Sequence, residues 1–573
     1  MILSCVGKYK KYALLTPLAI MLEVLMEISI PYVMSKIIDV GINNGDMAYV
    51  VKMGVLMILM AIFSLTMAIT AGRFAAVAAM GFSSNLRKKL FYKLSDFSFH
   101  NIDKYSTASL STRMTTDITN AQQAFMMLIR SAVRSPMMLV SATLMATNIN
   151  SELAVTFFVA IPILAVILGA IIRIVHPRFR IMLERYDKMN SIVQETLIAI
   201  RAVKAFVRGD HETEKFEEAA NSVRKAQLAA EKIVILNMPA MQFIAYSCMI
   251  SVLWFGGNKI IAGTMLTGEL ISFLTYIMQI LMSLMMLSMI FITFVFARAS
   301  ISRINEIFNE VPDINNDDAD KNLKVKDGSI KFKNVSFSYS KNKNNITLSD
   351  VSFEIGSGET VGILGGTGSS KTTLVQLIPR LYDVLEGEVE VGGNNVKKYT
   401  LDHLRDEVAM VLQKNVLFSG SIIDNLRWGD KNASDEEIIK ACKAAQAHEF
   451  IEKFPDGYNT ILGQGGVNLS GGQKQRLCIA RALLKKPKII ILDDSTSAVD
   501  TATDKKIRDA LRTNLAHTTS ITIAQRVTSV MEADKIIILD DGKINAVGTH
   551  ADLLENNEIY RELYTSQQKG VQE

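Results

Sequence analysis

Six long apolar segments in the first half of the chain constrain its fold more than any other feature. About 20 apolar residues span the hydrocarbon core of a bilayer as a helix, so each segment is long enough to cross. The segments cover residues 13–40, 50–80, 121–147, 152–175, 232–256 and 267–296. The second half is polar, so the mean hydropathy of +0.22 averages two different parts. The sequence therefore predicts a membrane domain at 1–310, a linker at 311–328 and a soluble domain at 329–573.

The connections between these segments predict the topology. Those after the second and fourth segments are long and basic, and the other three are short. Because basic loops stay on the cytosolic side, six crossings place both termini and both long connections in the cytosol. The long connections are rich in helix formers, with Pro177 as the main breaker, which predicts helices that continue as cytosolic stalks. Their tips, 103–113 and 198–208, are either solvated helix ends or the places where a cytosolic domain pushes.

Charged residues inside the apolar segments are costly and therefore informative. Glu23 and Glu27 lie four residues apart in the first segment, and Arg130 and Arg134 lie four residues apart in the third, so each pair shares one helix face. We expect the acidic and basic pairs to form ion pairs across helices, with contact to a charged substrate as the alternative. A stripe of methionines in the sixth segment is either simple packing or an adaptable apolar binding surface: Met278, Met282, Met285, Met286 and Met289.

A glycine-rich loop in the second half is the first sign of nucleotide binding. Residues 365–373 read Gly-Gly-Thr-Gly-Ser-Ser-Lys-Thr-Thr and follow a predicted buried strand at 360–364. In such a loop the backbone N–H groups surround phosphates, Lys371 neutralises the β and γ phosphates, and the Thr372 hydroxyl binds Mg²⁺. Ser370 stands where the strict pattern requires glycine, which makes this loop alone only moderately specific.

Polar residues at the ends of three further predicted strands complete the chemistry. Gln413 follows the strand 408–412, where its amide can reach the metal or the attacking water, and Gln525 follows the strand 521–524. Asp493 ends the strand 489–492, where a carboxylate can hold Mg²⁺, and Asp494 comes next, where hydrolysis requires a base. The run Ser470-Gly471-Gly472 begins a predicted helix, whose free N–H groups can approach a phosphate closely.

The order and spacing of these motifs resemble those of the ATP-binding cassette exporters over nearly the whole chain. Residues 365–373 resemble Walker A, Gln413 the Q-loop, 469–473 the signature, 489–493 Walker B, 497–500 the D-loop and Gln525 the switch position. The resemblance implies a multi-domain fold, with a six-helix α-helical transmembrane domain followed by an α/β P-loop nucleotide-binding domain. It also implies a dimer that binds ATP between Walker A of one chain and the signature of the other.

The resemblance assigns the site residues. Tyr339, 32 residues before Lys371, stands where the family stacks an aromatic ring on adenine. The implied Mg²⁺ ligands are Thr372, Gln413 and Asp493, and the base and switch positions hold Asp494 and Gln525. The implied nucleotide contacts are Tyr339, Gly366, Thr367, Gly368, Ser369, Ser370, Lys371, Thr372, Thr373 and Gln413, with Ser470, Gly471, Gly472 and Gln473 acting on the ATP of the partner chain.

Departures from the family pattern predict an asymmetric assembly. The base is Asp494 where the family has glutamate, the switch is Gln525 where it has histidine, and Ser370 and Gln464 differ as well. A carboxylate one methylene shorter is a poor base for an in-line water. Because the signature is intact, the chain is similar to the degenerate-site half of bacterial heterodimeric multidrug exporters, whose partner carries the competent site.

Substrate and alternative functions are less determined by the sequence. The resemblance implies export of amphipathic small molecules, with drugs as the family default. The alternatives are an ATP sensor or regulator without transport, and a homodimeric exporter of lipid or peptide. The net charge of +5 is small for 573 residues and gives no reason to expect nucleic acid as a partner.

Overall fold

The chain divides into two compact units. The structure is a computed structural model that describes residues 2–494, 499–514 and 517–572. One unit, here called the helical unit, comprises Met1–Ser95 and Thr107–Glu310, and the other, the α/β unit, comprises Asp96–Ser106 and Val311–Glu573. The segment Asp96–Ser106 lies in the first long connection of the sequence, yet it belongs to the α/β unit.

In the described part of the helical unit, the regular elements are all helices, and several of them are much longer than a bilayer is thick. Helices α2, α7 and α11 contain 49, 48 and 43 residues. At 1.5 Å per residue they are roughly 65–75 Å long, about twice the hydrocarbon thickness. The elements are η1 (Ile2–Tyr9), α1 (Lys10–Lys36), η2 (Ile37–Ile42), α2 (Met47–Ser95), α4 (Thr107–Thr112), η3 (Arg113–Asp117), α5 (Ile118–Ile129), α6 (Ser131–Ile149), α7 (Ser151–Ile198), α8 (Ile200–Ala205), α9 (Gly209–Val234), α10 (Asn237–Ile261) and α11 (Thr267–Asn309).

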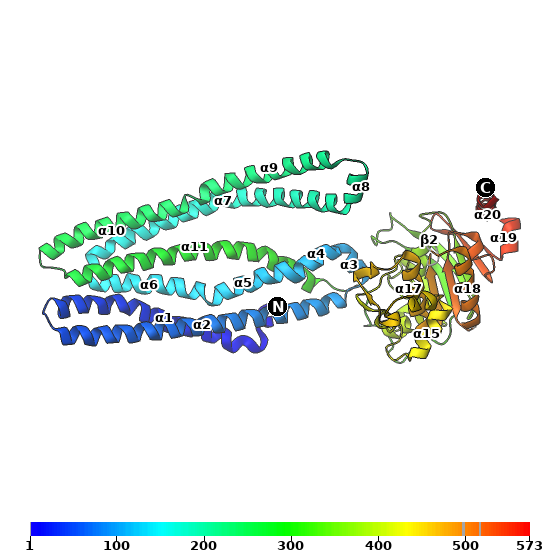
Figure 1. Cartoon of the computed structure of the whole chain (residues 1–573), viewed down its shortest axis with the longest axis horizontal. Coiled ribbons are helices and arrows are strands. Elements are labelled where there is room, and N and C mark those ends of the chain that lie inside the picture. The colour runs from blue at the N-terminus through cyan, green and yellow to red at the C-terminus, as the bar shows by residue number, and fades with distance from the viewer. Residues whose placement is uncertain (1, 495–498, 515–516, 573) are drawn as a thin grey trace. The chain divides into compact units, whose positions relative to one another are not determined.

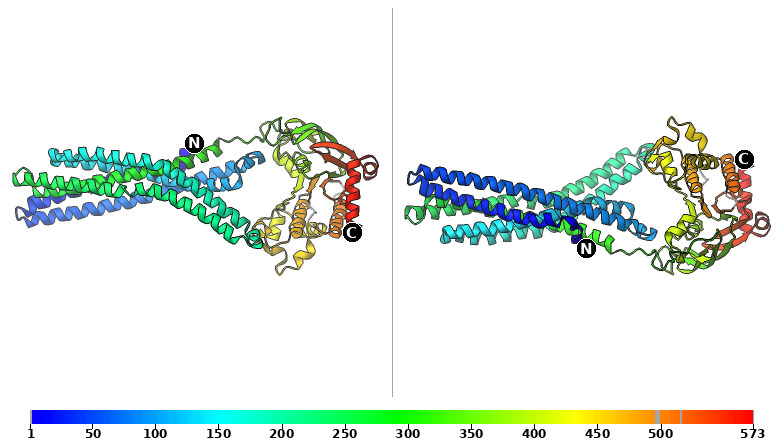
Figure 2. Two further views of the ribbon diagram at one scale, coloured as in Figure 1. Left: turned by 90° about the horizontal axis from the view of Figure 1, so that it is seen from above. Right: turned by 90° about the horizontal axis from the view of Figure 1, so that it is seen from below.

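Helix α7 continues through the proline that the sequence marked as its main breaker. Pro177 and Pro162 both lie inside α7. A proline removes one backbone hydrogen bond, and in a long helix packed against a neighbour this local loss does not end the helix. Helix α9 runs alongside α7, and the pair diverges from the other helices toward α8 (Figures 1 and 2).

Five described helices are long and apolar enough to cross a membrane, against six expected. They are Ser4–Ile42, Met47–Ser95, Ser151–Ile198, Gly209–Ile261 and Thr267–Phe291. The sixth crossing is not confirmed because residues 121–147 do not form one helix. They are divided between α5 and α6, which meet at Arg130, where the backbone has φ −109° and ψ −73°. Helix α6 also carries Arg134 and Asn148, which lower its hydropathy.

The charges inside the helical unit are partly paired, as expected. Arg134 of α6 lies 3.0 Å from Glu23 and 2.6 Å from Glu27, both on α1, measured from guanidinium nitrogen to carboxylate oxygen. Glu23 is buried, so this pair replaces the hydration that its carboxylate loses. Arg130 is exposed and makes no ion pair within the described part of the chain, so only one of the two predicted arginines joins the cluster.

The α/β unit contains a six-stranded, mostly parallel sheet beside a four-stranded antiparallel sheet. The strand orders are β12-β11-β3-β10-β9-β6 and β2-β1-β4-β5, and β7 pairs with β8. The strands are β1 (Ile330–Phe337), β2 (Leu348–Ile355), β3 (Thr360–Leu364), β4 (Glu386–Val391), β5 (Asn394–Asn395), β6 (Val408–Val411), β7 (Gly420–Ser421), β8 (Ile461–Leu462), β9 (Ile489–Asp493), β10 (Thr519–Ile523), β11 (Lys535–Asp540) and β12 (Lys543–Gly548). One core lies between the two sheets, and another packs the helices around α17 against the opposite face.

Helices cover and connect these strands. They are α3 (Phe99–Tyr105), α12 (Lys371–Gln376), η4 (Val396–Lys398), α13 (Leu401–Glu407), α14 (Ile422–Leu426), α15 (Asp435–Ala444), α16 (His448–Glu452), η5 (Gly457–Asn459), η6 (Gln464–Gly466), α17 (Gly471–Leu484), α18 (Thr501–Asn514), η7 (Val527–Ser529), α19 (His550–Asn556) and α20 (Glu558–Gln572). Neighbouring parallel strands end at the same edge of the sheet, so residues that follow β3, β6, β9 and β10 meet there.

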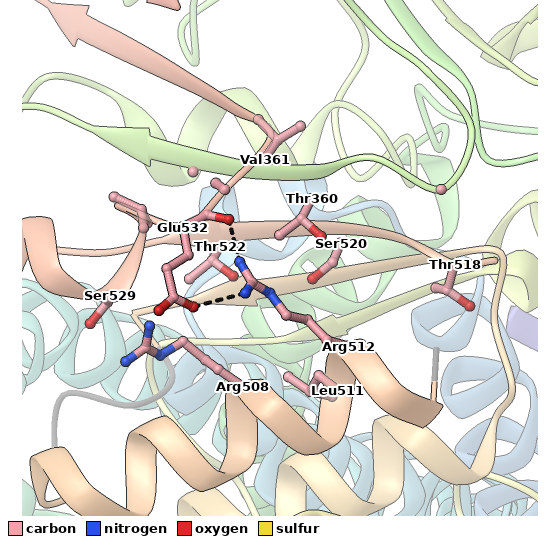
Figure 3. Close-up of a pocket in the computed structure, with 14 residues that line it drawn as sticks. Thr360, Val361, Arg508, Leu511, Arg512, Thr518, Ser520, Thr522, Ser529 and Glu532 are labelled. Atoms are coloured by element: carbon pink, nitrogen blue, oxygen red, sulfur yellow. Dashed lines mark hydrogen bonds and ion pairs between the residues drawn. The ribbon is translucent and has the colours of Figure 1, made fainter. Parts of the chain in front are cut away.

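Strand β10 has one unexpectedly polar face. A central parallel strand is covered on both sides and usually reads as continuously apolar. In β10, Ile521 and Ile523 are buried in the core between the sheets, whereas Ser520 and Thr522 face the other side. There they line a cavity of about 160 Å³ between β10 and α18, opposite Arg508 and Arg512 (Figure 3).

Candidate functional site

The loop 365–373 connects β3 to α12 and depends on glycine at its start. A side chain on Gly365 would place its Cβ 2.2 Å from the Leu539 carbonyl oxygen and 2.6 Å from Ser369 Oγ, so only glycine fits. Ser370, where the strict pattern has glycine, adopts φ +70° and ψ 23°. This left-handed conformation is costly for a residue with a side chain, which is the physical reason for the family's preference.

Lys371 folds over this loop. Its Nζ donates hydrogen bonds to the carbonyl oxygens of Gly365 (2.9 Å) and Gly366 (2.7 Å) and to Ser369 Oγ (3.2 Å). Burial lowers the pKa of Lys371, and the carboxylates of Asp494 and Asp493 oppose that shift. The ammonium is thus positioned above a loop whose backbone can surround phosphates.

Thr372 and Asp493 form a pair that suits a hard cation. Thr372 Oγ1 donates to Asp493 Oδ1 over 3.0 Å. Asp493 Oδ2 is buried and has no hydrogen-bond partner within the described residues. Burial raises the pKa of Asp493, and the nearby Asp494 carboxylate raises it further. A hydroxyl and an unpartnered carboxylate oxygen fit Mg²⁺, which takes the rest of its ligands from phosphates and water.

Asp494 lies between two glutamine amides. Its Oδ2 accepts from Gln525 Nε2 over 2.8 Å and lies 3.5 Å from Gln413 Nε2. The three residues follow the neighbouring strands β10, β9 and β6, which explains why residues far apart in sequence meet. Burial raises the pKa of Asp494, and the hydrogen bonds from Gln413 and Gln525 act in the opposite direction. Gln413 therefore contacts the base position here, and among the described residues it makes no hydrogen bond to Thr372 or Asp493, the other two predicted metal ligands.

The signature run begins helix α17. Ser470 is the N-cap: its Oγ accepts from the Gln473 backbone N–H over 3.3 Å, and the Gln473 side chain accepts from the Ser470 N–H over 2.9 Å. This reciprocal cap leaves Ser470 and Gly471 exposed. The start of α17 is therefore open to another molecule.

Tyr339 presents a half-exposed ring close to the loop. Its side chain is 41% exposed, which leaves a face for stacking, and its hydroxyl lies 2.9 Å from Thr373 Oγ1. The rings of Phe337 and Tyr382 contact it edge to face, with centroid distances of 4.9 and 5.2 Å. Sequence reasoning did not single out Tyr382, since no motif contains it; only its aromatic character after the loop helix was a signal.

The structure therefore brings together the loop 365–373, Asp493, Asp494, Gln413 and Gln525. The predicted D-loop, 497–500, lies partly outside the described residues, because 497 and 498 are not described. The nucleotide and metal roles of the individual side chains stay predictions. What the geometry supplies is an ammonium, a carboxylate–hydroxyl pair and a second carboxylate at one sheet edge.

Comparison with known proteins identifies the architecture. The family model for the ABC transporter transmembrane region matches residues 14–285, and the model for the ABC transporter matches 348–497. The chain is 38% identical to the uncharacterized ABC transporter ATP-binding protein YfiB of Bacillus subtilis, over 97% of each chain. It is 33% identical to the ATP-dependent lipid A-core flippase of Desulfotalea psychrophila, over 82% of this chain and 81% of that protein.

A solved structure agrees with this assignment at the level of the fold. The structure of a bacterial Atm1-family ABC exporter with ATP bound matches with a TM-score of 0.85 and 24% identity, over 98% of this chain and 99% of the other. At that identity the likeness concerns the fold alone. Together with the family matches and the relative at 38% identity, these findings show that the chain belongs to the ABC transporter family, as an ATP-driven half-transporter that couples ATP hydrolysis to export across a membrane.

Proposed function

We propose that this chain is the degenerate-site subunit of a heterodimeric exporter. The observation that carries the proposal is the environment of Asp494, the residue at the base position. Its Oδ2 accepts a hydrogen bond from the Gln525 amide at 2.8 Å, with the Gln413 amide at 3.5 Å. An amide cannot take up a proton near neutral pH, so neither glutamine can assist Asp494 as a base.

The geometry at Asp494 supports slow hydrolysis in this chain's own site. The carboxylate is one methylene shorter than glutamate, and a misplacement of about 1 Å can cost a factor of about 100 in rate. Burial raises the pKa of Asp494, but the hydrogen bonds from both amides oppose that rise and hold the carboxylate in place beside the sheet edge. ATP would still bind, because Lys371, Thr372 and Asp493 retain the groups that hold phosphates and Mg²⁺.

The role of the bound Mg²⁺ follows from the same residues. Thr372 Oγ1 and the unpartnered Asp493 Oδ2 would hold the ion, which would neutralise charge on the β and γ phosphates. Lys371 would exchange its present loop carbonyls for phosphate oxygens. These side chains bind and orient ATP, and they do so without the base.

The exposed start of α17 supports the other half of the proposal. Ser470 and Gly471 are exposed, and the cap formed with Gln473 is intact. In a homodimer every composite site would contain the weak base. With a partner whose base is glutamate, this chain's Ser470, Gly471 and Gly472 would complete the competent site, where most hydrolysis would occur.

For the membrane part, we propose six crossings with both termini in the cytosol of a bacterial cell, and amphipathic small molecules as cargo. The sixth crossing would be formed by α5 and α6 together. Four methionines of α11 are 39–56% exposed in the single chain: Met278, Met282, Met286 and Met289. Flexible thioether side chains suit apolar ligands of varied shape. The relative named as a lipid A-core flippase makes lipid the second candidate cargo.

The test of the proposal compares the chain alone with the chain coexpressed with a consensus-site half-transporter, both in lipid nanodiscs. We expect ATP binding in both samples, and vanadate-sensitive ATPase and dye efflux only in the pair. The double variant Asp494→Glu with Gln525→His, tested in the lone chain, distinguishes the homodimeric alternative from the heterodimer. If it restores rapid turnover there, the chain works with a second copy of itself.

Two further outcomes distinguish the remaining alternatives. A pair that hydrolyses ATP but moves neither dye nor fluorescent lipid would indicate the regulator or sensor. Movement of fluorescent lipid without dye would replace drugs by lipid as the cargo. Brisk ATPase and transport by the unmodified lone chain would refute the heterodimer proposal.

A further inference from the structure

Tyr382 lies between Tyr339, the residue predicted to stack on adenine, and the short helix α3. Its ring meets the Tyr339 ring edge to face, with centroids 5.2 Å apart and an interplanar angle of 87°. On its other side its ring lies 6.0 Å from that of Phe99, and its hydroxyl donates to Asp103 Oδ2 over 2.9 Å. Phe99 and Asp103 both belong to α3, so one side chain contacts both regions.

On the Tyr339 side, ring contacts and a hydrogen bond hold the tyrosine rings in place. Phe337 contacts Tyr339 and Tyr382 edge to face, with centroid distances of 4.9 and 5.7 Å. The Tyr339 hydroxyl lies 2.9 Å from Thr373 Oγ1 on the loop helix α12. Edge-to-face contacts are directional because the positive ring edge faces the negative ring face. A rotation of Tyr339 therefore disturbs Tyr382 as well.

The other side of the arrangement is attached through α3. Its N-cap Ser98 donates a hydrogen bond to the Asp313 carboxylate, and Asn101 Nδ2 donates to the Val311 carbonyl over 3.3 Å. These two bonds hold the beginning of α3, whereas Asp103, near its end, is held by Tyr382. Tyr382 therefore contributes to the placement of α3 through Phe99 and Asp103, beside the bonds that hold its beginning.

We propose that Tyr382 is a positioning residue through which an adenine base stacked on Tyr339 fixes the placement of α3. The proposal rests on the function proposed above, since it requires ATP at the loop 365–373. The phosphates and the base then have separate effects. The loop binds the phosphates, and the base acts on α3 through Tyr339 and Tyr382. By linkage, a firmly placed α3 strengthens binding of the base to the same degree.

The test measures hydrogen exchange in the full-length chain, paired in lipid nanodiscs, with ATP or with tripolyphosphate, which has no base. Both compounds are added at concentrations that saturate protection of residues 365–373. We expect ATP to slow exchange at 96–106 about fivefold more than tripolyphosphate does, as one ring contact and one hydrogen bond allow. Equal slowing by the two compounds would overturn the proposal.

Variants at Tyr382 complete the design. Tyr382→Leu removes the ring and should abolish the difference between ATP and tripolyphosphate at 96–106, and Tyr382→Phe, which keeps the ring, should retain part of it. Tyr458→Phe is the matched control, since that tyrosine hydroxyl is bonded to His448 Nδ1 at 2.9 Å, outside the Tyr339 and α3 contacts. If Tyr382→Leu keeps the full difference between ATP and tripolyphosphate at 96–106, the role of Tyr382 is refuted, while the proposed function still stands. Failure of ATP to protect 365–373 in the unmodified pair would refute the proposed function and, with it, this inference.

Discussion

Replacing Asp493 by asparagine should stabilise the nucleotide-free protein while it weakens Mg²⁺-ATP binding. Asp493 is 2% exposed, and its Oδ2 lacks a hydrogen-bond partner within the described residues. An unsatisfied buried polar group costs about 1–3 kcal/mol, and more when it is charged, while the bond from Thr372 returns about 1 kcal/mol. Asparagine keeps an acceptor for Thr372 and replaces the buried charge by a neutral amide, whose unpartnered NH2 group costs less than an unpartnered charge. We therefore expect Asp493→Asn to gain about 1 kcal/mol without ligand.

The matched control is a second buried aspartate with the opposite expectation. Asp504 is 5% exposed and its Oδ1 also lacks a hydrogen-bond partner within the described residues, but its Oδ2 lies 3.3 Å from Arg508 Nε, so its charge is paired. Asp504→Asn removes the charge that faces this largely buried arginine, so we expect a loss of about 1–3 kcal/mol, after allowance for partial solvent screening. The same substitution thus stabilises at one position and destabilises at the other.

Hydrogen exchange of the β9 amides measures this difference without requiring a single unfolding transition. In EDTA without nucleotide, exchange at 489–493 should slow in Asp493→Asn and quicken in Asp504→Asn. With Mg²⁺-ATP at about 100 times its dissociation constant, the unmodified protein should gain about 2.7 kcal/mol of protection, and Asp493→Asn should gain clearly less. Faster exchange in ligand-free Asp493→Asn would refute the reasoning.

The effect of pH on this variant has a definite sign. Burial raises the pKa of Asp493 in the folded protein. Between the unfolded and folded pKa values, the folded state binds more protons, so stability falls as pH rises through that window. Asparagine does not titrate. The advantage of Asp493→Asn should therefore be absent near pH 4, increase with pH, and become constant above the raised pKa.

Three further changes test the packing. Ser370→Gly should stabilise the loop by about 0.5–1 kcal/mol, measured as slower exchange at 365–373, because serine holds φ +70° there. Ser520→Val together with Thr522→Val should raise the free energy of opening of β10, measured by hydrogen exchange, by about 1 kcal/mol. The reason is that neither hydroxyl has a protein partner among the described residues and both residues line the cavity in Figure 3. Arg134→Gln should lower the melting temperature in nanodiscs, because it leaves the buried Glu23 without its cation; unchanged melting would show that the ion pair adds no stability.

Much of the architecture was predictable because it is encoded locally. The strands 360–364 and 489–492 are short apolar runs, and both form, as β3 and β9. Asp493 and Asp494 follow from the end of a buried strand, whereas the steric need for glycine at 365 comes mainly from the Leu539 carbonyl on a distant strand. Local patterns of this kind specify elements and motif order. They do not specify how many helices cross the membrane, since the apolar run 121–147 is divided between two helices that meet at Arg130.

The sequence by itself determined the membrane-plus-ATPase class, and it predicts the phosphate loop and the altered base and switch positions. Only the tertiary structure decided that Gln413 contacts Asp494, 81 residues away, and that Asp103 contacts Tyr382, 279 residues away. It also decided that Arg134, and not Arg130, pairs with Glu23 and Glu27. The physical reason is that apolar periodicity and turn residues act over a few positions, whereas these contacts depend on which strands and helices pack side by side.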